Sequence, residues 1–397
     1  MSVSLACVRA RFGPSYLAAH GLSAGQAKAW RAIAACRTAA LGGARLRCDS
    51  CGVEQWRWHS CRNRHCPRCQ KQAADTWRRA RIAELLDAPY AHLVFTVPHE
   101  LDALARRHPR WVYETTLAAA AATLTEFAAN ERWLGGQAAF TLVLHTWTQD
   151  LRLHIHAHAL MACGALTRDG RWQRPARSDR FVFPVHALSK VFAGKFRSTL
   201  AAAERDGRLP RDAVCTPADR RRRAHELRCK DWVVYAKTPL AGPSTVLDYL
   251  SRYTHRTAIG HERIVSVRHD AVRLRVRGDG HGKKVVRIDG AEFVGRFLQH
   301  VLPPGFKRIR HYGLLAAAHK TQRLAQARAA LRMPAPNPIA AQTAAEFMRR
   351  VAHIDLARCP HCHGPWRAVA SCAPQRGPLW PRAGSPAAST AAQPQAP

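Results

Sequence analysis

The chain has 397 residues, in which 62 Lys and Arg against 27 Asp and Glu give a formal net charge of +35. This length can bury a sizeable core and predicts two or three domains. So large a positive excess favours a polyanionic partner, with nucleic acid as the first candidate, although a GC-biased genome would also enrich arginine. No run of about 18 apolar residues and no basic leader with an apolar core occurs, so we expect no membrane span and no secretory signal.

The N-terminal part is expected to form a helical and zinc-binding module over residues 1–86. Helix-forming sequence at 15–42 and again at 71–86 has apolar residues near helical spacing. Between them lie Cys48-Asp-Ser-Cys51 and Cys66-Pro-Arg-Cys69, two knuckles that together supply four ligands for a tetrahedral zinc ion. The alternate ligands in the intervening loop are Cys61, His59 and His65. Thiolates at this spacing, without an export signal, indicate metal binding in a reducing cytoplasm rather than disulfides.

The second domain is expected over residues 87–330. Its sequence alternates between stretches with strand and helix character, which indicates an α+β fold. In chain order, the strands are expected at 91–97, 139–147, 153–160 and 231–236, and the longer helices at 111–129 and 293–301.

The stretch Leu153-His-Ile-His-Ala-His-Ala-Leu160 alternates imidazoles with apolar side chains. In a β-strand, this period of two places His154, His156 and His158 on one face and the apolar side chains on the other. A strand with one face against a core and three nitrogen ligands on the other is half of a site for a divalent metal. A surface strand that happens to be rich in histidine is the alternative.

The segment Thr245 to His255 is predicted to be helical, which places Tyr249 and Tyr253 on one face. Packing a helix onto a sheet is the commoner role of such a pair, but these two lie among basic residues. A tyrosine hydroxyl, with a reference pKa of about 10, is a poor nucleophile until a metal polarises the target phosphate. Metal-binding histidines and a facing tyrosine are the parts needed for DNA transesterification through a phosphotyrosine. No Gly-x-x-x-x-Gly-Lys-Ser/Thr loop is present, so we expect no nucleotide cofactor.

Near the C-terminal end, apolar residues of 272–276 alternate with arginines and a Gly-rich turn leads into 283–288, which predicts a β-hairpin with one basic face. Residues 331–372 are expected to hold a helix and a further knuckle, Cys359-Pro-His-Cys362. Half a site indicates metal binding only weakly. Residues 373–397 are rich in Pro, Ala, Ser and Gln and are expected to form a disordered tail.

Several longer segments form a combined pattern. They are Ser60-Cys-Arg-Asn-Arg-His-Cys-Pro-Arg-Cys-Gln70, Val94-Phe-Thr-Val-Pro-His-Glu100, Leu144-His-Thr-Trp147, Phe183-Pro-Val185, Tyr249-Leu-Ser-Arg-Tyr-Thr-His-Arg256 and Arg308-Ile-Arg-His-Tyr-Gly313. Together with the histidine strand, they resemble the IS91-type insertion-sequence transposases, rolling-circle enzymes of the HUH (His-hydrophobic-His) endonuclease superfamily. The resemblance extends to about residue 330 of the sequence. This chain departs from the family pattern at Ile155 and Ala157, where the family has proline and a bulkier residue.

The resemblance implies an HUH endonuclease-type antiparallel sheet flanked by helices and preceded by the zinc module. It places the metal-binding pair on His156 and His158, with His154 as the preceding histidine, and the paired nucleophiles on Tyr249 and Tyr253. Gln149 and His255 are further candidates for the third ligand. It also implies structural zinc, catalytic magnesium or manganese, single-stranded or hairpin DNA from the ends of a mobile element, and a bacterial, nucleoid-associated cytoplasmic location. DNA contacts are expected at Arg62, Arg64, Arg68, Arg252, Arg256, Arg273 and Arg275.

Two alternative functions follow from the same residues. A rolling-circle replication initiator or relaxase would use the same chemistry, and terminal element sequences flanking the gene would separate it from a transposase. A non-catalytic zinc-containing DNA-binding protein, derived from a decayed transposase, would bind DNA in a salt-sensitive manner. That binding would survive replacement of both tyrosines by phenylalanine, and no covalent adduct would form.

Overall fold

An antiparallel sheet forms the centre of the computed structural model, which describes residues 4–175, 182–209, 216–240, 257–278, 282–337, 340 and 342–374. The strand order is β11-β4-β5-β3-β7, and a short strand, β6, extends the sheet by pairing with β5. The strands are β3 (Tyr90–Thr96), β4 (Gln137–Trp147), β5 (Leu153–Leu166), β6 (Trp172–Gln173), β7 (Val234–Leu240) and β11 (Ile309–Gly313). β5, which carries the histidines, is therefore central, with β4 and β3 on either side.

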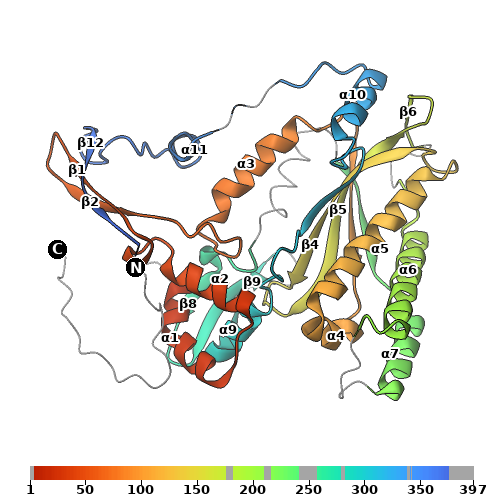
Figure 1. The fold of residues 1–397 in the computed structure, drawn as a ribbon, viewed down its shortest axis with the longest axis horizontal. Coiled ribbons are helices and arrows are strands. Elements are labelled where there is room, and N and C mark those ends of the chain that lie inside the picture. Colours follow the sequence, from red (N-terminus) through yellow and green to blue (C-terminus); the bar gives the residue numbers. More distant parts are fainter. Residues whose placement is uncertain are drawn as a thin grey trace.

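Helices cover one face of this sheet (Figure 1). They are α4 (Asp102–Arg107), α5 (Pro109–Ala129), α6 (Val185–Arg205) and α7 (Pro217–Cys229). The alanines of α5 let it lie close to the strands, while Phe192 of α6 packs edge-to-face on Phe95 of β3 with ring centroids 5.2 Å apart. Both phenylalanines are fully buried, so the main core lies between these helices and the sheet.

A second core joins the N-terminal helices to a smaller sheet of order β10-β9-β8. It contains α1 (Leu5–Ala19), α2 (Ala24–Ala35), β8 (Ile264–Val267), β9 (Ala271–Arg277), β10 (Lys283–Asp289) and α9 (Gly290–Leu298). The single helix expected at 15–42 is corrected to α1 and α2, because Ser23 and Gln26 form a capping box that begins α2. The β9–β10 hairpin is confirmed, and Arg273 and Arg275 are exposed while the apolar residues between them are buried.

A third, three-stranded sheet of order β12-β1-β2 joins the two ends of the chain. β1 (Gly43–Cys48) and β2 (Glu54–Trp58) form a hairpin, and β12 (Trp366–Cys372) pairs antiparallel with β1. Figure 1 shows this sheet at one extremity of the molecule. The segments that connect it to the central sheet contain α3 (Gln70–Ile82) on one side and α10 (Lys320–Ala330) and α11 (Ala344–Ala352) on the other.

The α+β class with antiparallel sheets and flanking helices is confirmed. The expected strands at 91–97, 139–147, 153–160 and 231–236 correspond to β3, β4, β5 and β7. Among the described helices, none combines the length and the apolar character needed to cross a bilayer. The tail expected over 373–397 lies outside the described residues from 375 onward.

Replacing Phe192 by alanine is expected to destabilise the main core. The change would remove a fully buried ring and leave a cavity between α6 and β3, with a loss of about 3–5 kcal/mol in the free energy of unfolding. Denaturant unfolding followed by circular dichroism measures this loss. Val233→Ala is the control, since Val233 is 59% exposed and its truncation is expected to change stability by less than about 0.5 kcal/mol. Equal effects of the two changes would contradict the placement of the core.

Candidate metal centre and nucleic-acid interface

The histidine strand has the two-faced arrangement that its sequence predicts. Ile155, Ala157 and Ala159 are each at most 1% exposed and belong to the core under α5 and α6. The histidines alternate with them along β5 and are partly exposed on the opposite face. The apolar face thus fixes the register of the strand, because a shift by one residue would bury the imidazoles.

Three histidines from two adjacent strands form a group that can hold a metal. His145 of β4 lies directly opposite His156 of β5 in the sheet register. One ligand nitrogen from each of His145, His156 and His158 lies within 4.8 Å of the others. Three imidazoles leave further coordination positions for water or substrate, as in catalytic rather than structural metal sites. We refer to these residues as the histidine trio.

The trio adds His145 to the candidates for the third ligand. His154 lies on the same face of β5, with its ring centroid 4.9 Å from that of His156 and 5.5 Å from that of His99, and it does not belong to the trio. Gln149 accepts a hydrogen bond from the backbone N–H of Arg277 at 2.6 Å, in the turn that follows β4. His255, the third candidate, lies outside the described residues. His145 was not identified from sequence as a ligand; its signal was the segment Leu144-His-Thr-Trp147 on the strand expected at 139–147, directly before the histidine strand.

Hydrogen bonds orient two of the three imidazoles. Nδ1 of His156 donates to the backbone oxygen of His154 at 2.9 Å, which leaves Nε2 as the unprotonated nitrogen. Nδ1 of His158 lies 2.9 Å from Nε2 of His92 on β3. Burial, together with the charges of Lys237 and His156, lowers the pKa of His92 to about 3. The neutral His92 can therefore accept the proton of His158 Nδ1 and leave Nε2 of His158 free for a metal.

The cysteines expected to form one zinc site are divided between two groups, so this expectation is corrected. The first group is Cys36, Cys61, Cys66 and Cys69, and the second is Cys48, Cys51, Cys359 and Cys362. The reason is the length of the β1–β2 hairpin: Cys48 and Cys51 lie in its turn, whereas Cys61 and Cys66 follow its base. The six residues of β1 separate turn and base by about 20 Å.

The first group has the dimensions of a zinc site. The sulfur of Cys69 lies 3.5 Å from that of Cys36 and 3.7 Å from that of Cys61, and Cys66 and Cys36 are 3.6 Å apart. Four sulfurs at about 2.3 Å from a tetrahedral ion are about 3.8 Å from one another. Cys36 follows the C-terminus of α2 and was not identified from sequence.

Neither histidine proposed as an alternate zinc ligand belongs to a cysteine group. His59 is exposed. Burial, with the nearby Arg64 and Arg308, lowers the pKa of His65 to about 3, so this side chain is neutral.

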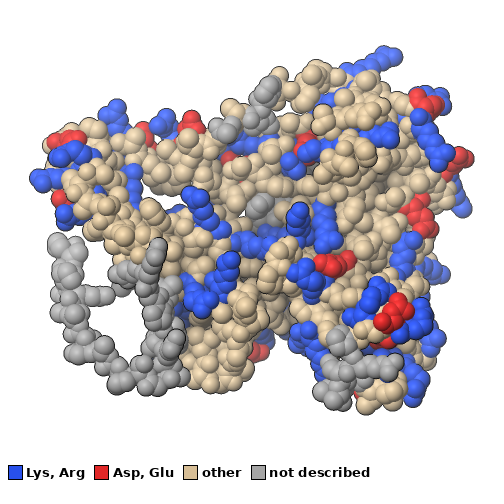
Figure 2. Space-filling view, viewed as in Figure 1, with Lys and Arg blue, Asp and Glu red and all other residues tan. Residues whose placement is uncertain are grey.

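The expected DNA-contacting arginines differ in their environments. Both terminal nitrogens of Arg64 donate to the backbone oxygen of Phe306, at 2.7 and 2.6 Å, so this guanidinium has a structural partner. Arg62 and Arg68 are exposed, and so are Arg273 and Arg275. Arg252 and Arg256 lie outside the described residues. Figure 2 shows that basic side chains far outnumber acidic ones on the visible face and gather across its middle.

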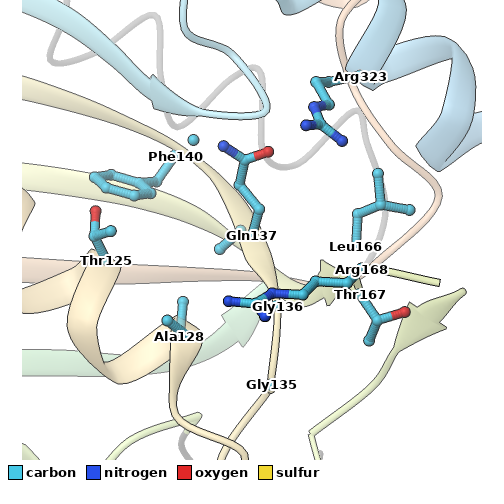
Figure 3. Close-up of a pocket in the computed structure, with 13 residues that line it drawn as sticks. Thr125, Ala128, Gly135, Gly136, Gln137, Phe140, Leu166, Thr167, Arg168 and Arg323 are labelled. Atoms are coloured by element: carbon cyan, nitrogen blue, oxygen red, sulfur yellow. The ribbon is translucent and has the colours of Figure 1, made fainter. Parts of the chain in front are cut away.

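A pocket lies at the other end of the central sheet, away from the trio (Figure 3). Gln137 and Leu166, which line it, are paired at the opposite end of the β4–β5 ladder from His145 and His156. Among the residues that the structure describes, its lining includes Arg168 and Arg323 but no histidine, cysteine or carboxylate. The pocket therefore lacks the groups that could hold a metal, and the trio remains the candidate centre.

Comparison with known proteins identifies the family of the chain. Residues 8–97 match the family described as "Transposase zinc-binding domain", and residues 139–323 match the family described as "Putative transposase". The chain is 42% identical over 363 residues to "Putative transposase y4qJ" of Sinorhizobium fredii, covering 89% of this chain and 91% of that one. It is 27% identical over 336 residues to "Transposase for insertion sequence element IS801" of Pseudomonas savastanoi pv. phaseolicola, covering 83% and 79%. No solved structure matches significantly.

Loss of one histidine of the trio is expected to weaken binding of Mn²⁺. Since even outer-shell changes cost metal sites about 10–100-fold in affinity, His145→Ala is expected to cost at least 10-fold, as measured from free Mn²⁺ by electron paramagnetic resonance. His154→Ala is the matched control, because it removes an imidazole from the same strand face but not from the trio. An equal loss in both variants would show that the trio is not the metal site.

Proposed function

This chain belongs to the IS91-type transposase family, and we propose that it cleaves and rejoins single-stranded DNA at the ends of a mobile element by tyrosine transesterification. The observation that carries the proposal is the histidine trio, which brings three imidazoles together on the central sheet, within the matched transposase region 139–323. If its substrate is element DNA, the protein acts at the bacterial nucleoid, and this location is part of the proposal.

The trio is proposed to position the scissile phosphate. A bound divalent ion, Mg²⁺ or Mn²⁺, would polarise a phosphate oxygen and stabilise developing negative charge. Hydrogen bonds to His154 and His92 orient the imidazoles of His156 and His158. Little reorganisation of these side chains is therefore needed when a metal binds. The apolar layer of Ile155 and Ala157 beneath them keeps β5 rigid.

Tyr249 and Tyr253 are the proposed nucleophiles, and both lie outside the described residues. In the proposed step, the tyrosine oxygen bonds to phosphorus as the bond to the 3′ oxygen breaks. The phenolic proton is lost, a 5′-phosphotyrosine forms and a 3′ hydroxyl is released. The reverse attack by a 3′ hydroxyl rejoins DNA, so the energy of the phosphodiester is retained. Two tyrosines would allow two linked attacks.

The described ends of the tyrosine segment support this assignment. On one side, Leu240 of β7 pairs with Tyr90 of β3, at the end of the sheet that lies beyond His158. On the other side, Ala258 and Ile259 are buried in the core that includes Trp147, whose register partner on β5 is Leu153. Along the strands, the trio lies between Tyr90, the partner of Leu240, and Trp147, which shares a core with Ala258 and Ile259.

Tyr235 is the competing nucleophile among the described tyrosines. Burial raises the pKa of the hydroxyls of the other four described tyrosines, Tyr16, Tyr90, Tyr113 and Tyr312. Tyr235 of β7 is 52% exposed, and Val94 of β3 pairs with both Tyr235 and His158. Tyr235 and His158 therefore lie in one row across the sheet and share its open face.

Replacing both proposed nucleophiles is expected to abolish covalent attachment to DNA. Purified protein, Mn²⁺ and labelled single-stranded DNA carrying the element end should give an adduct that survives denaturing electrophoresis. Tyr249→Phe and Tyr253→Phe should each reduce it, and the double change should remove it. Tyr235→Phe should leave it unchanged.

The outcomes separate the candidate functions. Dependence of the adduct on Tyr235 alone would overturn the assignment of the nucleophiles. If the parent binds both DNA and Mn²⁺ and yet forms no adduct on its own element end, the non-catalytic DNA-binding function replaces the proposed one.

The basic face of the β9–β10 hairpin is proposed to contact the DNA backbone. Arg273 lies opposite Arg287, and Arg277 lies opposite Lys283, so cations from both strands share one exposed face with Arg275. Arg287 forms an ion pair with Asp270, but the face still carries more cations than anions. A phosphate backbone lying over this face would be attracted by the excess positive charge.

Arg273→Gln with Arg275→Gln is expected to weaken single-stranded DNA binding and its dependence on salt. Loss of two phosphate contacts should reduce the slope of log affinity against log salt by about 1.4, as measured by fluorescence anisotropy over a salt series. The matched control is Arg205→Gln with Arg208→Gln, whose side chains are 73% and 56% exposed at the end of α6, on the covered side of the sheet. An equal change in both double variants would show that the effect comes from the lower net charge and not from DNA contacts at this face.

A further inference from the structure

A second group of four cysteines lies at the turn of the β1–β2 hairpin. Its members are Cys48 and Cys51 from the N-terminal module and Cys359 and Cys362 from the C-terminal knuckle. Their ligand atoms all lie within 4.8 Å, with sulfur–sulfur distances of 3.4 Å for Cys48 and Cys362 and 3.7 Å for Cys51 and Cys359. A tetrahedral zinc ion with bonds of about 2.3 Å requires sulfur–sulfur distances of about 3.8 Å.

The two knuckles have the same backbone geometry. The N–H of Gly52 donates to the oxygen of Cys48 at 3.0 Å, and the N–H of His363 donates to the oxygen of Cys359 at 2.9 Å. Gly52 and His363, each one residue after the second cysteine, have left-handed φ values of 73° and 60°. A non-glycine residue rarely adopts this conformation, so its repetition at His363 indicates a turn that is shaped to direct both thiols of a knuckle to one side.

Close contacts hold the C-terminal knuckle against the hairpin. A Cβ atom on Gly364 would lie 2.3 Å from Oγ of Ser50 and 3.1 Å from Sγ of Cys48, so only glycine fits there. The N–H of Asp49 donates to the oxygen of Pro365 at 3.1 Å, and its carboxylate accepts from Nε of Arg367 at 2.9 Å. The knuckle is therefore docked on the hairpin turn by backbone as well as side-chain contacts.

The sheet formed by β1, β2 and β12 has almost no core of its own. In the part of the chain that the structure describes, none of the three clusters of buried apolar side chains includes a residue of these strands. A three-stranded sheet that buries so little apolar surface needs another source of stability, such as a metal or a disulfide. The cysteines here are free thiols.

We propose that Cys48, Cys51, Cys359 and Cys362 hold a second structural zinc ion, which fastens the C-terminal segment to the N-terminal module. The paired cysteines are separated by 308 and 314 positions in the sequence. The matched zinc-binding region, residues 8–97, contains the first cysteine group completely but only half of the second. The N-terminal module is thus completed only after the C-terminal knuckle has been synthesised.

Zinc content of the full chain tests the stoichiometry. The protein purified under reducing conditions is expected to contain two zinc ions per chain, measured by mass spectrometry of the metals after gel filtration. Cys359→Ser with Cys362→Ser should reduce this number to one. The matched control is Cys7→Ser with Cys229→Ser, which removes two exposed thiols outside both groups and should retain both ions. One ion in the parent, or two in the Cys359/Cys362 variant, would overturn the proposal.

Cleavage of the connecting segment tests the fastening directly. A specific protease site inserted after Pro336, in the exposed stretch 334–337, would separate the C-terminal fragment from the rest. The fragment should remain bound after cleavage and be released by a zinc chelator or by Cys359→Ser with Cys362→Ser. Asp75→Ala, which removes the ion pair of Asp75 with Arg350, should leave it bound. Retention of the fragment in the cysteine variant, equal to that in the parent, would show that zinc does not fasten it.

Discussion

The period of two in β5 is the constraint on which the candidate centre depends. A central strand is hydrogen-bonded to a neighbour on each edge. Its alternate side chains must therefore suit two environments, one on each face of the sheet. In β5, the small side chains of Ala157 and Ala159 let α5 approach closely on one face, and the imidazoles occupy the other. The hydrophobic free energy of the main core thereby fixes which face the histidines occupy, since a shift of the strand by one residue would exchange the two faces.

This coupling explains why part of the centre could be predicted. Alternation within one strand is a local property, so the shared face of His156 and His158 follows from their spacing alone. The partner His145 depends on the register of β4 against β5, which the ladder irregularities between 138 and 140 and between 145 and 147 shift from simple counting. Local periodicity contains no information on that register, and so the sequence left His154, Gln149 and His255 open as third ligands and did not single out His145.

The cysteines show the same limit at longer range. Spacing within a knuckle predicts that two thiols turn to one side, and this prediction holds at Cys48, Cys51, Cys359 and Cys362. Which two knuckles lie close enough to share an ion depends on the tertiary structure. The rigid β1–β2 hairpin removes Cys48 and Cys51 from Cys66 and Cys69, and β12 brings a knuckle from the other end of the chain. Two complete sets of four cysteines could have been suggested by counting, but their membership required the sheet topology.

The two kinds of ligand group suit different tasks in one molecule. Each cysteine group offers four thiolates, a donor set that favours zinc. Four ligands fill its tetrahedral coordination, so no position remains for a substrate. The trio offers three imidazoles on an open sheet face, with positions left for phosphate oxygens. Because the thiolate groups lie in the module and at the hairpin turn, whereas the trio lies on β4 and β5, structural metal and proposed catalytic metal need not compete for the same donors. The β1–β2 hairpin that separates the cysteine groups also places the sheet of β1, β2 and β12 at one extremity of the molecule (Figure 1). The C-terminal segment therefore meets the N-terminal module away from the central sheet, and the histidine face of β5 is left to the DNA that we propose is cleaved there.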